Sequence, residues 1–217
     1  MNNIIMKMTS AYDFQDFYKE IPGIHMLNFF DLPGTRCYLD EDAKSTIIEQ
    51  MAPLSYEGIH FIDSGNYHYL SLLFLLQIKE DFNLVLFDHH PDNQPPSFGS
   101  ITSCGGWVLE ATEQLPHLKK VFTYGTGQEI PIDHIPMDLP IYISIDKDIL
   151  DRAYAITDWD QGDMSLDTML SMLESICKNR KILGVDVSGD SGEDAENGAF
   201  VNNQTNAILF DFLSKKF

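Results

Sequence analysis

The sequence predicts a three-layer α/β/α fold with a mainly parallel sheet, in a single domain that spans residues 1–217. Three observations lead to this prediction. Strand-like and helix-like segments alternate along the chain with short links, which is typical of right-handed crossovers between parallel strands. Several strand candidates are continuous apolar runs, as expected for strands that helices cover on both faces. No internal repeat, low-complexity tract or linker divides the 217 residues.

The first part of the chain predicts strands and helices in alternation. After a loosely patterned N-terminal region, residues 25–30 form the first strand candidate and residues 58–63 the second, with a helix at 41–51 between them. Residues 66–80 would be apolar on most sides of a helix, so we expect a well-buried helix there. Residues 83–87 are an apolar run bounded by turn residues, which indicates a strand buried on both faces.

Prolines and a glycine between residues 91 and 99 predict a loop after this strand. The remaining segments are, in order, a helix at 106–114, strands at 120–124 and 141–145, a helix at 165–178, a strand at 182–187 and a helix at 203–213. Ser165 stands at the N-cap position of its helix, where a hydroxyl oxygen accepts a hydrogen bond from the first turn. Because ligands of such folds bind beyond the carboxyl ends of the strands, the residues that follow the strands are the candidates for a site.

The composition is that of a globular and strongly acidic protein. Hydrophobic residues make up 44% of the chain, and 33 Asp plus Glu against 14 Lys plus Arg give a formal net charge of −19. Such a surface repels phosphate backbones, and no basic patch opposes it, so we expect no nucleic-acid partner. The carboxylates of a metal site would account for part of the acidic excess.

The sequence does not predict export or membrane insertion. The N-terminal residues lack the long apolar segment of a signal peptide, and the most apolar stretch, residues 69–76, is far below the ~20 residues that cross a bilayer. Cys37, Cys104 and Cys177 are odd in number, widely spaced and outside any Cys-x-x-Cys pattern. This argues against a disulfide framework and against a Cys-rich zinc site. We therefore expect a cytoplasmic protein without a membrane partner.

Acidic and imidazole residues follow two of the strand candidates, in Asp88-His-His90-Pro-Asp92 and in Asp146-Lys-Asp148. Successive side chains of a strand alternate between its faces, so Asp88 and His90 point one way, as do Asp146 and Asp148. If the two strands are adjacent, three carboxylates and an imidazole share a small volume. Carboxylates packed so closely repel one another and lose hydration unless a cation joins them. The sequence therefore predicts a metalloenzyme.

His68 adds an imidazole just after another strand candidate, near the start of the buried helix. The complete candidate set is His68, Asp88, His90, Asp92, Asp146 and Asp148. In this order the set resembles the metal signature of the arginase and deacetylase superfamily, in its ureohydrolase form. That family carries a Gly-Gly-Asp-His segment, then Asp-Ala-His-x-Asp, then Ser-x-Asp-x-Asp-x-x-Asp.

The family segments can be followed one by one, and the resemblance covers residues 58–190. The middle segment is matched by Asp88–Asp92, with His89 in place of the Ala. The last is matched at every fixed position, by Ser144, Asp146, Asp148 and Asp151. The first, Ser64-Gly-Asn-Tyr-His68, keeps the His and lacks the Asp before it. Three segments in the right order are a more specific signal than any one of them.

The resemblance implies two divalent metal ions, usually manganese. Asp88 and Asp146 would bridge both ions, His68 and Asp92 would complete one, and His90 and Asp148 the other. Carboxylate oxygens with one imidazole per ion suit Mn²⁺, and Zn²⁺ or Fe²⁺ less exclusively. A hydroxide that bridges the ions would hydrolyse a C–N bond, of amidine, guanidine or amide type, in a small molecule. Asp92 would lie beside this hydroxide and is the catalytic candidate, to orient it or relay its proton.

Two departures from the family pattern argue against arginase itself. In guanidino hydrolases a Glu after the Gly-x-Asp-x-x strand holds the cationic substrate, whereas this chain has Val187-Ser-Gly-Asp190 there. We take Asp190, together with Asp186, as the candidates for substrate contact. A cationic substrate is expected if the acidic run 190–196 forms a rim. The proton-shuttling His of arginases is also missing, because Ser103-Cys-Gly-Gly-Trp stands in its place.

Other interpretations stay open. Asp88, His90 and Asp146 would also serve the single zinc ion of a deacetylase-like enzyme. The missing Glu and His would fit a non-catalytic arginase-like protein that binds metal or senses a ligand. Asp and His are ordinary residues of strand ends and turns, so Asp186 fits a simple strand end and the run 190–196 a solvated surface.

Three further residues near the motifs have simpler interpretations. His89 and Lys147 fall on the opposite strand face from the ligand candidates, which favours a supporting or packing role. Asp151 is expected to hold the loop after its strand, as the matching family residue does. Members of the family are often oligomeric, so a homo-oligomer is a further expectation.

Overall fold

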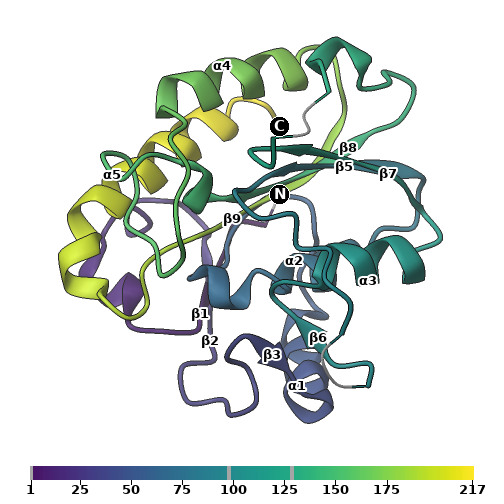
Figure 1. Ribbon diagram of the computed structural model, residues 1–217. Helices are drawn as coiled ribbons and strands as arrows, with labels where there is room; N and C mark the ends of the chain where they lie inside the picture. Colours follow the sequence, from purple (N-terminus) through teal and green to yellow (C-terminus); the bar gives the residue numbers. More distant parts are fainter. Residues whose placement is uncertain (1, 97–98, 128–129) are drawn as a thin grey trace.

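Seven segments of the described chain form one parallel sheet, in the order β2-β1-β4-β9-β8-β5-β7 (Figure 1). This computed structural model describes residues 2–96, 99–127 and 130–217. The strands are β1 (Ile4–Lys7), β2 (His25–Asn28), β4 (Ile59–Phe61), β5 (Phe82–Phe87), β7 (Leu118–Tyr124), β8 (Ile141–Asp146) and β9 (Ile182–Ser188). All residues of β4, β5 and β8 are buried, which agrees with their unbroken apolar sequences.

Helices cover both faces of this sheet (Figure 1). They are α1 (Glu41–Met51), α2 (Leu70–Leu75) and α3 (Trp107–Gln114) on one face, and α4 (Leu166–Cys177) and α5 (Ala195–Leu213) on the other. Alternate residues of β5 serve the two sides, since Leu84 packs with the first group of helices and Val85 with the second. The predicted three-layer α/β/α fold with a parallel sheet is confirmed.

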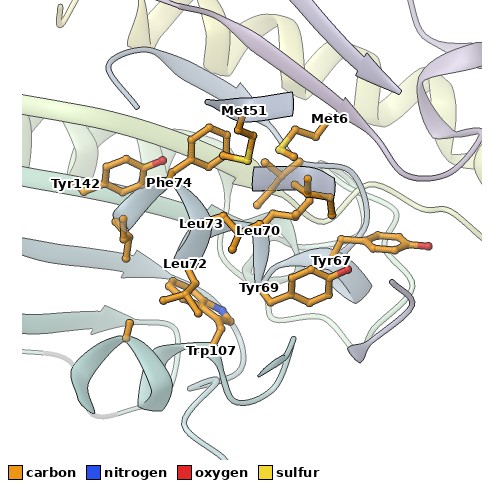
Figure 2. Packing of buried hydrophobic residues seen from close by; sticks show 14 of the residues in the cluster. Met6, Met51, Tyr67, Tyr69, Leu70, Leu72, Leu73, Phe74, Trp107 and Tyr142 are labelled. Carbon is orange, nitrogen blue, oxygen red and sulfur yellow. The ribbon is translucent and has the colours of Figure 1, made fainter. Parts of the chain in front are cut away.

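Helix α2 is wholly buried, although it has only six residues. Figure 2 shows Leu72 and Leu73 of this helix between Met51 of α1, Tyr142 of β8 and Trp107 of α3. A helix that is apolar on all sides cannot face water, so α2 forms part of the core between the sheet and the outer helices. It also fixes the segment just before it, which carries His68.

Short elements complete the described chain. β3 (Tyr38–Leu39) and β6 (Thr102–Ser103) form a two-stranded antiparallel ribbon outside the main sheet. Single 3₁₀ turns are η1 (Ala11–Phe14), η2 (Gly65–Tyr67), η3 (Ile132–His134) and η4 (Lys147–Ile149). Within the described ranges no helix combines the length and the apolar character that crossing a bilayer would require.

Three predicted elements differ in the structure. The first strand is β1, not residues 25–30; β2 lies at the sheet edge and is largely exposed. The helix expected at 66–80 divides into a 3₁₀ turn and the shorter α2. The helix expected at 203–213 begins earlier, at Ala195, and its added part is held to the loop before it by two hydrogen bonds between Asn202 and the backbone of Ile156. Helix α1 has the predicted bounds.

Candidate metal centre

The predicted ligands meet at the carboxyl ends of β5 and β8, which are adjacent strands. Phe87 pairs with Ile145 in the sheet, so the next residues, Asp88 and Asp146, leave the two strands side by side. Asp148 lies in the 3₁₀ turn that follows β8. His68 caps the 3₁₀ turn between β4 and α2.

One group of donor atoms surrounds Nδ1 of His68. This nitrogen lies 3.2 Å from Oδ2 of Asp88, 3.1 Å from Oδ2 of Asp92 and 3.5 Å from Oδ2 of Asp146. Each of the four side chains is at most 9% exposed. The ligand atoms of His68, Asp88 and Asp92 all lie within 4.8 Å of one another, a spacing that one metal ion can fill.

A second group surrounds Nδ1 of His90. It lies 2.7 Å from Oδ2 of Asp148 and 3.7 Å from Oδ1 of Asp88. Ligand atoms of Asp88, His90 and Asp148 also lie within 4.8 Å of one another. Asp88 thus offers one oxygen to each group, which is the arrangement of a bridging carboxylate. All six predicted ligands are brought together, and the two groups fit a binuclear metal site.

Backbone turns aim these carboxylates. Oδ1 of Asp88 accepts a hydrogen bond of 2.6 Å from the amide of His90, and Oδ1 of Asp146 accepts one of 3.0 Å from the amide of Asp148. Asp92 adopts a φ of 44°, and the indole of Trp107 donates to its Oδ2 at 2.7 Å. In both cases an aspartate oxygen accepts a hydrogen bond from the backbone amide two residues later, which is the geometry of an Asx turn.

Serine and aspartate side chains orient His68 from behind. Ser144 donates to Oδ1 of Asp186 at 2.6 Å, and its oxygen lies 2.9 Å from Nε2 of His68. Since the serine proton goes to Asp186, the serine oxygen accepts from Nε2–H of His68. The neutral ring then directs the lone pair of Nδ1 at the carboxylates, which is the tautomer of a metal ligand.

The electrostatics of the site favour a bound cation. Burial, followed by the charge of Asp92, raises the pKa of Asp88 well above its usual range. Burial and the neighbouring Asp148 raise the pKa of Asp146 to about 7. Oδ2 of Asp88 is buried and has no hydrogen-bond donor among the described residues, although Nδ1 of His68 lies 3.2 Å away. The donor chemistry and this unsatisfied oxygen both fit a bound metal ion.

The two histidines show the same requirement. The hydrogen bond to Asp148 raises the pKa of His90 to about 10. Burial alone would lower the pKa of His68, yet the carboxylates of Asp88 and Asp92 outweigh it and raise the pKa well above its usual value. Without a metal ion, protons on the imidazoles therefore take the place of the cation. With metal ions bound, each imidazole would be a neutral ligand of the ion in its own group.

A cavity of about 330 Å³ opens over the site. Besides the six candidate ligands its lining consists of Cys37, Tyr38, Gly65, Gln94, Pro95, Ser103, Cys104, Gly105 and Trp159. The sequence interpretation missed Trp159, whose ring lies 5.8 Å from that of His90, and Asp160, whose Oδ1 lies 3.1 Å from Nε2 of His90. Both belong to the loop after η4, and no pattern of the sequence links this loop to the strand ends.

The two predicted substrate residues are not part of the cavity lining. Asp186 lies within β9, not at its end, and reaches the site through Ser144; burial raises its pKa to about 6. Asp190 is completely buried and pairs with Lys147, its Oδ2 lying 3.0 Å from Nζ. The structure therefore does not support direct substrate contact by either residue. Asp190 cannot contact a substrate because its carboxylate is buried in an ion pair with the ammonium group of Lys147.

The neighbours of these residues follow the simpler interpretations. Glu193 is exposed and pairs with Arg36, so this part of the acidic run is solvated surface. Lys147 is buried on the far side of its strand from the ligands, where it donates to Asn206 of α5 at 2.8 Å. Asp151 is exposed and accepts a hydrogen bond of 2.8 Å from the amide of Ala153, as a turn residue does.

The strand end that follows Asp186 approaches the ligands closely. Gly189 has a φ of 86°, and a Cβ atom at this position would lie 2.3 Å from Oδ1 of Asp146 and 2.7 Å from the amide of Lys147. Only glycine fits this contact without displacing the ligand turn. The chain therefore passes directly behind the candidate metal ligands on its way to Asp190.

Comparison with solved structures identifies the fold. The chain superposes on arginase from Bacillus caldovelox with a TM-score of 0.65 and 14% identity, covering 100% of this chain and 97% of the other. The chain has the arginase fold. Formimidoylglutamase from Bacillus subtilis and proclavaminate amidino hydrolase from Streptomyces clavuligerus give TM-scores of 0.64 and 0.63, each at 14% identity. They are covered over 85% and 91% of their lengths, and this chain over 99% and 97%.

Sequence comparison adds a nearer relative of this arginase-fold chain. This chain is 34% identical over 195 residues to an uncharacterized protein of Thermotoga maritima, and the match covers 82% of this chain and 78% of the relative. The chain belongs to the same family as that protein. No family model matches the chain. The resemblance to arginases predicted from the metal motifs is thus confirmed at the level of the fold.

Proposed function

We propose that this protein is a metal-dependent hydrolase that cleaves a C–N bond, of amidine, guanidine or amide type, in a small molecule. The observation that carries the proposal is the position of Asp88, whose two oxygens face two separate carboxylate–imidazole groups at the strand ends of an arginase fold. The arginase-family hydrolases that share the fold support the same class of reaction.

Two divalent ions would be held by the six predicted ligands, with Mn²⁺ as the first candidate and Zn²⁺ or Fe²⁺ as alternatives. His68 and Asp92 would serve one ion, His90 and Asp148 the other, and Asp88 and Asp146 both. When bound, such a pair of ions supplies Lewis acidity and hydroxide near neutral pH. The buried Oδ2 of Asp88 supports this assignment, because it accepts no hydrogen bond from the described residues and lies 3.2 Å from Nδ1 of His68, the other proposed ligand of that ion.

Asp92 is the residue we assign to the attacking water. It lines the cavity, and Trp107 fixes its Oδ2 by a hydrogen bond of 2.7 Å. A carboxylate held in this way can orient the water or take up its proton. Trp107 is completely buried and also contacts His68, with ring centroids 5.0 Å apart. The indole therefore keeps both side chains in position and excludes bulk water from behind them.

The cavity favours an uncharged or cationic substrate. Its lining contains four aspartates and neither Lys nor Arg, so two divalent ions would neutralise the aspartates and no cationic side chain of the lining would pair with a substrate carboxylate. Tyr38 and Trp159, each 40% exposed, offer ring faces that attract cations or pack on apolar groups. The family's substrate-binding Glu is absent and Asp190 is occupied by Lys147, so the proposal excludes arginase itself.

Two alternatives compete with this proposal. The lack of the substrate Glu favours a non-catalytic arginase-like protein that binds metal or senses a ligand. A single-zinc deacetylase-like enzyme would need only Asp88, His90 and Asp146, and it leaves the buried His68–Asp92 pair unexplained. Metal stoichiometry and turnover separate the three.

The experiment measures bound metal per chain and turnover on a panel of guanidines, amides and acetylated amines. We expect two Mn²⁺ per chain and turnover of a substrate without a carboxylate. Asp88→Ala should lose metal and activity together, whereas Asp151→Ala, which changes an exposed aspartate of the last family segment, should keep both. Full metal content in Asp88→Ala would contradict the proposal. Two bound ions without any turnover would favour the non-catalytic alternative, and one bound zinc the deacetylase-like one.

A further inference from the structure

We propose that Cys37 and Cys104 form a redox-active dithiol, a covalent modification site that closes to a disulfide on the wall of the metal pocket. The two residues are far apart in the sequence, and both line the cavity over the ligands. The inference does not depend on the reaction that the metal site performs.

The geometry follows from the ribbon of β3 and β6. Tyr38 pairs with Ser103 and Leu39 with Thr102, both antiparallel. The next opposed pair is Cys37 and Cys104, and the amide of Cys104 donates to the carbonyl of Cys37 at 2.9 Å. The amide of Cys37 donates to the carbonyl of Asn66 and its φ is 58°, so the regular ribbon ends at this pair. Opposed residues of antiparallel strands have Cα atoms about 4.5–5.5 Å apart. This lies inside the range of about 4.4–6.8 Å that a disulfide spans.

Both cysteines line the same cavity, although Cys37 lies just outside the regular ribbon. Cys37 is half-buried, and its thiol donates to Oδ1 of Asn66 at 3.1 Å. Cys104 is only 8% exposed. A reagent that enters the pocket therefore meets Cys37 first, and Cys104 is placed to resolve the adduct.

The chemistry is a two-step thiol–disulfide exchange with a small disulfide as the oxidant. The Cys37 thiolate attacks one sulfur of the reagent, forming a mixed disulfide and releasing one thiol. Cys104 then attacks the Cys37 sulfur, and its proton passes to the second thiol as that thiol leaves. Two electrons pass from the cysteines to the reagent, and the two cysteine protons end on the released thiols. The product ties the segment before β3 to the segment after β6, both of which shape the pocket wall.

The experiment treats the full-length protein with bis(2-hydroxyethyl) disulfide and follows the intact mass and the peptide map. A neutral reagent is chosen because the chain carries a formal charge of −19 and would repel an anionic disulfide. We expect a product that has lost two hydrogen atoms, with Cys37 linked to Cys104, and full reversal by a thiol reductant. The same result is expected with and without Mn²⁺, so it stands or falls separately from the hydrolase proposal.

Variants provide the controls. Cys104→Ser should stop at a mixed disulfide on Cys37, because no second thiol is placed to resolve it. Cys177→Ser removes the third cysteine, at the end of α4, and should leave the internal disulfide unchanged. A stable adduct on Cys37 of the unmodified sequence, a disulfide that includes Cys177, or an unreactive protein would each overturn the proposal.

Discussion

Nζ of Lys147 lies 3.0 Å from Oδ2 of Asp190, and neither side chain is exposed to solvent. Lys147 opens the 3₁₀ turn η4 after β8, between the candidate ligands Asp146 and Asp148. Asp190 follows β9 and also accepts from Gln15 at 2.8 Å. Burial lowers the pKa of Lys147, and the charge of Asp190 opposes that shift. This pair anchors the ligand turn of the metal centre to the far side of the sheet.

Breaking this pair should destabilise the protein strongly. Lys147→Met leaves an unpaired carboxylate in the core, and we expect a loss of about 3–5 kcal/mol in the free energy of unfolding, measured with urea. The double variant Lys147→Met/Asp190→Asn should recover part of this loss, because it removes both charges. If Asp190→Asn alone kept normal stability and changed only the KM of a substrate, the substrate role predicted from the sequence would be reinstated.

Replacing Asp88, the proposed bridging ligand, should abolish metal binding without lowering the stability of the metal-free protein. Without metal, Asp88→Asn should unfold at a Tm at least as high as the unmodified protein, because burial disfavours its charged form. Saturating Mn²⁺ should raise the Tm of the unmodified protein only. At an Mn²⁺ concentration of 100 times the Kd, its free energy of unfolding should increase by about 2.7 kcal/mol. Thermal unfolding with EDTA and with Mn²⁺ measures both effects. An equal Mn²⁺ response in the variant would contradict the shared-ligand assignment.

The hydrogen bonds that link His68 through Ser144 to Asp186 should set the affinity for the ion that His68 would bind. Ser144→Ala removes the acceptor that fixes the ring tautomer, so we expect metal affinity at the His68 group to fall by about 10–100-fold. The His90 group should be unaffected, which calorimetric titration would resolve as one weakened site. Ser188→Ala is the matched control, since this serine is buried at the end of β9 and has no hydrogen-bond partner among the described residues. Equal weakening in both variants would argue against the tautomer mechanism.

His60 should make stability depend on pH away from the metal site. It is completely buried, stacks on Phe74 with ring centroids 4.1 Å apart, and lies 3.0 Å from the carbonyl of Tyr56. Burial lowers its pKa to about 4. The unfolded chain takes up this proton below about pH 6.5 whereas the folded protein does not, so stability falls as the pH drops from about 6.5 towards 4.

The effect can be measured as a difference between two proteins. Between pH 7.5 and 4.5 the contribution of His60 amounts to about 2–3 kcal/mol. His60→Gln cannot titrate and should lose this part of the pH dependence, in urea unfolding experiments with EDTA present. The carboxylates of the metal centre titrate equally in both proteins and cancel. Parallel curves for the two proteins would show that His60 is not the titrating group.

The sequence predicted those parts of the site that depend on local geometry. Asp88 and Asp146 follow apolar strands that are buried on both faces, and parallel pairing alone brings their ends together. Helix α1 was equally predictable, because Asp40 caps it and accepts from the amide of Ala43 at 2.8 Å. Single-domain extent, cytoplasmic location and homo-oligomer formation stay predictions.

The rest depends on contacts between distant segments. Asp190 looks like surface when it is seen beside its acidic neighbours, and only the docking of α5 buries it against Lys147. Trp159 enters the pocket because its loop folds back over His90. β1 has only four residues and no flanking turn signal, yet it lies inside the sheet because β2 and β4 pair with it on either side.

The burial of Lys147 also bears on the order in which a newly made chain can mature. All six candidate ligands leave the ribosome before α5. The polar partners of this lysine are made later, because Asp190 follows β9 and Asn206 lies in α5. Until Asp190 and α5 have been synthesised and have docked, the turn between Asp146 and Asp148 carries a cation that the core cannot accept. A nascent chain halted at the end of β9, before Asp190, should therefore be bound by chaperones or cleaved by proteases, with its metal-binding residues complete and still unable to hold an ion firmly.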